Sequence, residues 1–227
     1  MPSRRTLLLA GLAGGVVGIG LAAVLVVAGV LERSPGSVDA SPAFLGAYER
    51  SRRATFAMDA AFSRTMPDGR RLESAAFVAQ RPPDSIRRQL GGVRGVVGGR
   101  RLNCSTAAGG DHCGPGGPAP PFEEAIVREL AILRSYFAGE APLYAVRAAG
   151  DGCFELDQRR AVIEPPYGER AVMCFDPSTG AMRALEVRHP GGVTDRLEAV
   201  TIRTEVSDAD FTTTRDGAYD PTIVPTS

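Results

Sequence analysis

Four cysteines and two histidines carry the most distinctive chemistry of this sequence. An even number of cysteines in an exported chain is typical of a disulfide framework, and four cysteines allow three pairings. We expect Cys104 to pair with Cys113 across a short glycine-containing loop. We expect Cys153 to pair with Cys174, because each lies in an alternating apolar run and the two runs are separated by a turn, as facing strands would be.

A metal site is the alternative use of the same residues, with Cys104, His112 and Cys113 as ligands. His112 and Cys113 are adjacent and no C-x-x-C spacing is present, which suits a tetrahedral zinc site poorly. The sequence therefore predicts no bound metal and no cofactor.

Catalysis requires a positioned base or an activated nucleophile, and the sequence offers neither. His112 precedes a cysteine expected to be bridged, and His189 precedes a Pro-Gly turn, so both are expected in exposed loops. No G-x-S-x-G, H-E-x-x-H or EF-hand motif is present, and Asp208-x-Asp210 lacks the later Gly and Glu of a calcium loop. We predict no enzyme activity.

The charge balance argues against nucleic-acid binding. Lys plus Arg number 26 and Asp plus Glu number 26, so no large field of one sign is available to hold a polyanion. All the basic residues are arginine, a bias typical of GC-rich coding sequences such as those of actinobacteria. Hydrophobic residues make up 44% of the chain, which is enough for a packed core.

The run Leu7–Leu31 contains no charged residue and predicts a membrane anchor. As a helix it would be about 37 Å long, against a hydrocarbon core of about 30 Å. Arg4 and Arg5 precede the run, so residues 1–6 are expected in the cytoplasm and the rest of this single-pass protein outside the cell membrane. The alternative is a signal peptide cleaved after Ala40, because Val38-Asp39-Ala40 resembles a cleavage site.

The same run has a small residue at every fourth position, a pattern that permits close helix packing. These residues are Ala10, Gly14, Gly18 and Ala22. They could support dimerisation, or they could simply reflect a Gly- and Ala-rich composition.

An extracytoplasmic domain is predicted over residues 41–214, after a linker at 32–40 and before a flexible tail at 215–227. We expect Ser41 to cap an amphipathic helix that has Pro42 in its first turn and ends near Arg53. Strand-like alternation then fills most of the domain. The expected strands and their turns cover residues 55–62, 71–80, 86–90, 93–97, 100–104, 143–147, 153–157, 171–175, 182–188 and 194–206.

A second helix is expected after Pro121 and before Gly139, with an apolar stripe at helical spacing. We expect this stripe to cover the sheet face lined by Phe56, Met58 and Phe62, so that helix and sheet together enclose a ligand cavity. The stripe consists of Ile126, Leu130, Leu133 and Phe137. We expect the helix to be a loosely packed plug, so that Leu130→Ala costs little stability; in a solid core the same substitution would cost about 2 to 5 kcal/mol.

The order of elements resembles the LolA-like superfamily of periplasmic lipoprotein carriers, mycobacterial envelope lipid-binding lipoproteins and RseB-type sensor domains. The resemblance covers about residues 42–214. It is carried by the first hairpin with its Asp68-Gly69 turn, the break at Arg81-Pro82-Pro83, the inserted helix, and closing strands that end at Asp210-Phe211. It implies an α+β fold, a curved antiparallel sheet or unclosed barrel covered by two helices, with an acyl-chain cavity on the concave face.

Two expected features differ from the lipoprotein carriers of this superfamily and bear on function. The carriers diffuse freely, whereas this chain is expected to have a membrane anchor, and the two expected disulfides are not part of the carrier pattern. We therefore keep two hypotheses. The first is a membrane-anchored binding domain for a lipid or a lipoprotein acyl chain. The second is a non-enzymatic envelope stress sensor or protein-interaction module with a filled core and an envelope protein as partner.

Overall fold

The computed structural model describes a single unit that begins at Asp39. The described residues are 39–89, 92–107, 110–113, 116–212 and 222–224. The expected anchor, with its stripe from Ala10 to Ala22, most of the linker and most of the tail lie outside them. No helix within the described ranges has the length and hydrophobicity needed to cross a membrane.

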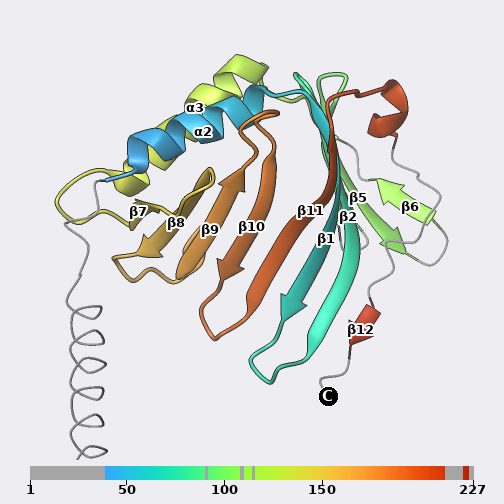
Figure 1. Cartoon of the computed structure of the whole chain (residues 1–227). Coiled ribbons are helices and arrows are strands. Elements are labelled where there is room, and N and C mark those ends of the chain that lie inside the picture. Colours follow the sequence, from blue (N-terminus) through green and yellow to red (C-terminus); the bar gives the residue numbers. More distant parts are fainter. Residues whose placement is uncertain (1–38, 90–91, 108–109, 114–115, 213–221, 225–227) are drawn as a thin grey trace, which may run out of the picture. The chain divides into compact units, whose positions relative to one another are not determined.

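One antiparallel sheet organises this unit. Eleven strands of the described chain follow the order β6-β5-β4-β3-β2-β1-β11-β10-β9-β8-β7, and β12 pairs with β2 (Figure 1). On this path β6 and β7 are the two edges, so the sheet is an unclosed barrel. The strands are β1 (Phe56–Thr65), β2 (Arg71–Arg81), β3 (Asp84–Gln89), β4 (Gly92–Val97), β5 (Arg100–Ala107), β6 (Gly110–Cys113), β7 (Tyr144–Ala148), β8 (Cys153–Gln158), β9 (Arg170–Phe175), β10 (Met182–Arg188), β11 (Thr194–Arg203) and β12 (Thr222–Val224).

Local turn chemistry explains why consecutive strands are neighbours. The first hairpin turns where Gly69 adopts a positive φ of 86°, and its N–H donates to the carbonyl of Met66 at 2.9 Å. Asp68 accepts a hydrogen bond from the Arg70 N–H at 3.1 Å. The break predicted at Arg81-Pro82-Pro83 is a tight turn between β2 and β3. The only pairing on the path between strands distant in sequence is β1 with β11.

Two helices, α2 (Ser41–Arg53) and α3 (Phe122–Phe137), lie side by side over one part of the sheet (Figure 1). They pack against each other and against β7, and α2 also contacts β9. The prediction that Ser41 caps α2 was wrong. Ser41 lies inside the helix, and its N–H donates to the Asp39 carboxylate at 3.0 Å, because an acidic side chain two residues earlier can reach this free N–H.

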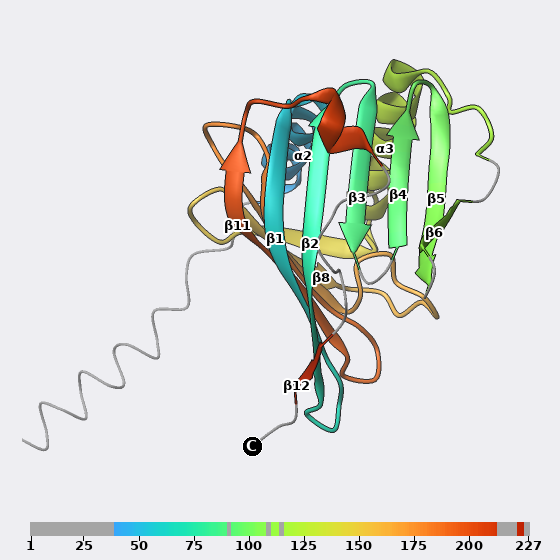
Figure 2. The ribbon, with the colours of Figure 1, turned by 90° about the vertical axis from the view of Figure 1, so that its right-hand side faces the viewer.

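The short helix η1 (Asp208–Phe211) covers the opposite face of the sheet from α2 and α3 (Figure 2). Phe211 packs there with Phe77 and Ile86. Asp210 closes a capping box with Ser207 and forms an ion pair with Arg203. The aspartates of the Asp208-x-Asp210 pattern therefore act in helix capping and ion pairing.

Three clusters of buried side chains form the core. The largest lies between the helices and β7–β10 and includes Phe44, Leu130, Leu156 and Met173. A second lies on the same sheet face around β1, β2 and β11, and the third is the cluster beneath η1. The α+β architecture with two helices over an open antiparallel sheet, predicted from sequence, is confirmed.

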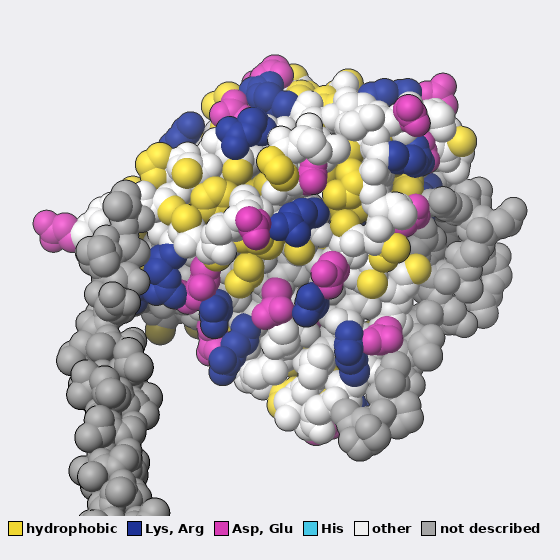
Figure 3. Space-filling model, viewed as in Figure 1, with side chains coloured by type: hydrophobic (Ala, Val, Ile, Leu, Met, Phe, Trp, Pro, Cys, Tyr) yellow, Lys and Arg dark blue, Asp and Glu magenta, His cyan; other side chains and the backbone are white. Residues whose placement is uncertain are grey.

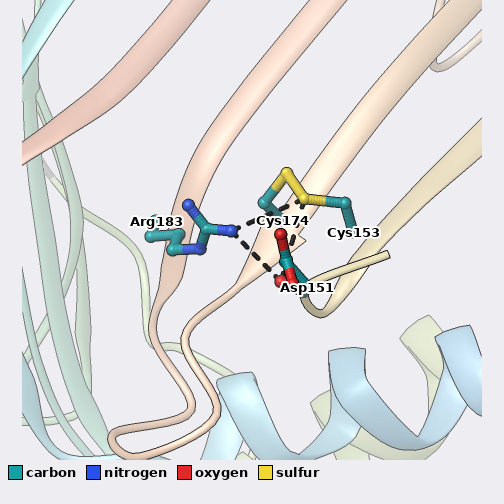
Figure 4. The surroundings of a disulfide bond; sticks show 4 residues. All are labelled: Asp151, Cys153, Cys174 and Arg183. Atoms are coloured by element: carbon teal, nitrogen blue, oxygen red, sulfur yellow. Dashed lines mark hydrogen bonds between the residues drawn. A yellow bond between two sulfur atoms is a disulfide. The ribbon is translucent and has the colours of Figure 1, made fainter. Parts of the chain in front are cut away.

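Both predicted disulfides are present, and each joins residues directly opposite each other on neighbouring strands. Cys104 of β5 is bonded to Cys113 of β6, and Cys153 of β8 to Cys174 of β9. Arg183 lies beside the second bridge and donates a hydrogen bond to the Asp151 carbonyl at 3.1 Å (Figure 4). His112 was expected in an exposed loop, but its backbone belongs to the short strand β6, where it pairs with Ser105 of β5.

Candidate functional site

A pocket of about 260 Å³ lies where the C-terminal end of α2 and the middle of α3 meet the concave face of the sheet. Apolar side chains form much of its wall. They come from β1, β2, β9, β10 and β11, and comprise Phe56, Met58, Val78, Phe175, Met182 and Leu197. These strands are neighbours only because β1 pairs with both β2 and β11, so the pocket depends on that central junction of the sheet.

An ion pair between the two helices forms one polar wall of the pocket. The Arg52 guanidinium donates two hydrogen bonds to the Glu129 carboxylate, at 2.8 and 3.2 Å. The Tyr48 hydroxyl also donates to Glu129, at 3.4 Å. Burial, together with the Glu129 charge, raises the pKa of Tyr48 to about 12, so this phenol is a hydrogen-bond donor at neutral pH.

Gln80 fixes the end of α2 against the sheet. Its amide nitrogen lies 2.6 Å from the Ser51 carbonyl, 3.0 Å from that of Arg52 and 2.8 Å from that of Ala54. The last carbonyls of a helix have no partner within it, so a buried side-chain amide can satisfy them where a glycine cap is absent. This strand residue thereby holds Arg52 at the pocket.

Arg87 of β3 and Arg94 of β4 form a second polar wall. They are directly opposite each other in the ladder, and both line the pocket. Arg87 is half-buried and Arg94 is exposed. Sequence reasoning missed both residues, as well as Arg52, Gln80 and Glu129. The only signal was the alternation Ser85, Arg87, Gln89, which reads as a solvent-facing strand edge.

The structure brings together only part of the predicted cavity. Phe56 and Met58 line the pocket, and Phe62 packs in the same cluster but does not line the pocket. The helix stripe lies over β7–β10 in the largest core cluster, with Ile126, Leu130 and Leu133 buried and Phe137 packed against them. The residue of α3 that lines the pocket is Glu129.

Titratable groups elsewhere are used in ion pairs and turns. His189 lies 3.1 Å from the Asp195 carboxylate, which also accepts two hydrogen bonds from Arg64, at 2.6 and 2.7 Å. The side chain of His112 lies outside the described part of the structure. No group of three His, Cys, Asp or Glu side chains in the described ranges could hold a metal ion.

The outer surface carries no continuous patch of one charge on the face seen in Figure 3, where arginines and carboxylates are interspersed. Several charged side chains of the sheet form cross-strand pairs. Arg147 lies 2.8 Å from Glu155, and Arg170 lies 2.8 Å from the same carboxylate. Water screens the two guanidinium groups, which are 40% and 54% exposed, and the opposite charges offset each other.

The arrangement of strands and helices is similar to that of several solved structures, all at low sequence identity. Among solved structures, a LolA superfamily protein from Nitrosomonas europaea is similar at 9% identity and a TM-score of 0.32, over 76% of this chain and 97% of that one. MucB is similar at 14% identity and a TM-score of 0.41, over 80% of this chain and 65% of MucB, and it has also been solved in complex with MucA. A DUF1329 family protein from Desulfovibrio piger is similar at 11% identity and a TM-score of 0.30, over 78% and 98% of the two chains.

No protein-family model matches the sequence, and no curated protein is similar to it in sequence. The structural similarities concern the arrangement of strands and helices. Residue roles are therefore taken from the geometry of this chain alone.

Proposed function

We propose that this protein is a membrane-anchored, extracytoplasmic domain that binds the acyl chain of a lipid or lipoprotein in the pocket beneath α2 and α3. The pocket itself is the observation that carries the proposal. Its apolar wall can bury a hydrocarbon chain, which gains roughly 0.8 kcal/mol for each buried methylene group. Its polar walls lie at the end of α2, the middle of α3 and on β3 and β4, where a headgroup could remain in contact with water.

The size of the pocket limits what enters it. Small-molecule sites usually enclose about 300 to 1,000 Å³, and this pocket, at about 260 Å³, lies just below that range. We therefore expect part of one acyl chain to enter. A whole chain would require α2 and α3 to shift, and the Arg52–Glu129 ion pair joins these helices beside the pocket.

Photo-crosslinking tests the proposal on the full chain in phosphatidylcholine nanodiscs. The probes are palmitic acid and hexadecanol, each with a diazirine in the chain, and labelled peptides are mapped by mass spectrometry. We expect labelling of β1 and β2 peptides by at least one probe. Val78→Phe should fill the pocket and reduce this labelling, whereas Val127→Phe, at a helix position that is 63% exposed, should not. Absence of label from both strands would refute the proposal.

The anchor and its compartment belong to the same proposal. Residues 7–31 would span the membrane, residues 1–6 would be cytoplasmic, residues 32–40 would link the anchor to the domain and residues 215–227 would form a tail. The two disulfides support an oxidising compartment for the domain. Recovery in the aqueous phase after detergent phase separation, or an N-terminus at Ser41, would refute the anchor.

A protein-interaction or sensor domain is the second candidate function. One observation favours it: the concave face over β7–β10 is filled by the helices and their buried side chains. This leaves a small pocket instead of a long channel. If the crosslinking experiment labels neither β1 nor β2, this function becomes the better explanation of the fold.

A further inference from the structure

We propose that the ligand of the pocket is an anionic amphiphile, with an apolar chain and a carboxylate or phosphate headgroup, and that Arg87 and Arg94 bind the headgroup. This inference rests on the function proposed above and names the class of ligand. Three observations support it: the position of the two side chains, the absence of a carboxylate partner for either among the described residues, and the bonds that the nearby carboxylates make to other groups.

The strand register places both arginines beside the apolar wall. Arg87 is paired with Val78 of β2, which lines the same pocket, and Val78 is paired in turn with Met58 of β1. Arg94 lies opposite Arg87 on the next strand. Arg87 is thus on the strand next to Val78, and Arg94 is one strand further. The end of a chain packed against Met58 and Val78 would therefore lie close to both guanidinium groups.

Neither arginine forms an ion pair with a carboxylate of the described residues. Arg87 donates one hydrogen bond, at 2.8 Å, to the neutral side chain of Gln89. Like charges directly opposite each other on neighbouring strands destabilise a sheet. Burial lowers the pKa of Arg87, Asp195 raises it, and the charge of Arg94 lowers it again. An anion between the two guanidinium groups would offset this repulsion.

The carboxylates near the pocket already have partners. Glu129 accepts hydrogen bonds from Arg52 and Tyr48. Asp195 is bonded to Arg64 and lies beside His189. The arginine pair is thus left to an external anion. Guanidinium groups suit this role, because their planar arrangement of donors matches the oxygens of a carboxylate or a phosphate.

The test compares headgroups on one chain length, again with the full chain in phosphatidylcholine nanodiscs. Diazirine-labelled palmitic acid and a phosphatidic acid with the same labelled chain are the anionic probes, and labelled hexadecanol is the neutral one. We expect at least one anionic probe to label β1 and β2 about tenfold more than the alcohol does. Which acid labels better identifies the headgroup as carboxylate or phosphate.

Variants assign this preference to the two arginines. The double variant Arg87→Gln, Arg94→Gln should label equally with acids and alcohol, and Arg87→Lys, Arg94→Lys should keep most of the preference. The control Arg128→Gln, Arg134→Gln removes the same charge from exposed positions of α3 and should behave as wild type. Because the glutamine variant removes a repulsive pair, its urea midpoint should equal or exceed that of wild type.

Two results separate the failure of this inference from that of the proposed function. Equal labelling of the pocket by acids and alcohol in wild type, or a preference that survives in the glutamine variant, overturns the anionic headgroup while leaving acyl binding intact. Absence of label from the pocket with every probe overturns both proposals.

Discussion

Truncation of two buried leucines should distinguish the solid core from the wall of the pocket. Leu130 is 4% exposed and lies in the core cluster beneath the helices without lining the pocket, whereas Leu197 is 2% exposed and lines the pocket. Leu→Ala substitutions in cores cost about 2 to 5 kcal/mol, and the cost rises with the volume of the sealed cavity that is left. The two sites differ in whether the new space is sealed.

We expect Leu130→Ala to cost about 4 kcal/mol, because its neighbours enclose the space that the side chain leaves. This replaces the small loss expected from sequence, which assumed that Leu130 covers an open cavity. Leu197→Ala should cost about 2.5 kcal/mol, because the space it leaves joins an existing pocket and little new cavity is sealed. The difference should therefore be about 1 to 2 kcal/mol.

Pulse proteolysis of the nanodisc-embedded chain at increasing urea concentration measures both unfolding free energies with the disulfides intact. Wild type gives the reference slope and midpoint. If Leu197→Ala proves as destabilising as Leu130→Ala, the pocket is not open space in solution. A loss well below 2 kcal/mol for Leu130→Ala would instead show that α3 is loosely packed.

Two further predictions concern the helix end and a turn. Gln80→Met should cost about 2 to 3 kcal/mol in urea unfolding, because it leaves carbonyls at the end of α2 without donors. The rate of amide hydrogen exchange in α2 should also rise. An unchanged exchange rate in α2 would exclude the capping role of Gln80. Hydrogen bonds from Ser178 and Thr179 lower the pKa of Asp176 to about 2, so its stabilising contribution is complete above pH of about 4 and is lost as pH falls through 2. Asp176→Asn should therefore flatten the stability profile between pH 4 and 2, and a profile identical to that of wild type would contradict this assignment.

Local signals made most of the secondary structure predictable. Alternation and turn residues located the hairpin around Asp68-Gly69, and helical spacing located α3. The pairing of Cys153 with Cys174 followed from the facing strands that contain them. Each of these features depends on residues close together in the sequence, so no knowledge of the tertiary arrangement was needed.

The pocket could not be predicted in this way, because its walls come from strands and helices far apart in the chain. The stripe of α3 identified a buried face but could not say which strands it would meet, and it meets β7–β10 instead of β1. Arg87 and Gln80 appear in the sequence as ordinary polar strand residues. Only the register with β1 and the position of α2 turn them toward a shared space.

The pairing of β1 with β11 has a consequence for assembly. Every other pairing on the path joins consecutive strands, so β1–β6 and β7–β11 are two runs of local hairpins that meet along one seam, at which Thr65 lies opposite Thr194. Local contacts form quickly, whereas a contact between distant segments waits for the chain to close a large loop. Each disulfide lies within one of these halves. The two disulfides can therefore form independently, one in each half, and the pocket forms only when the seam closes.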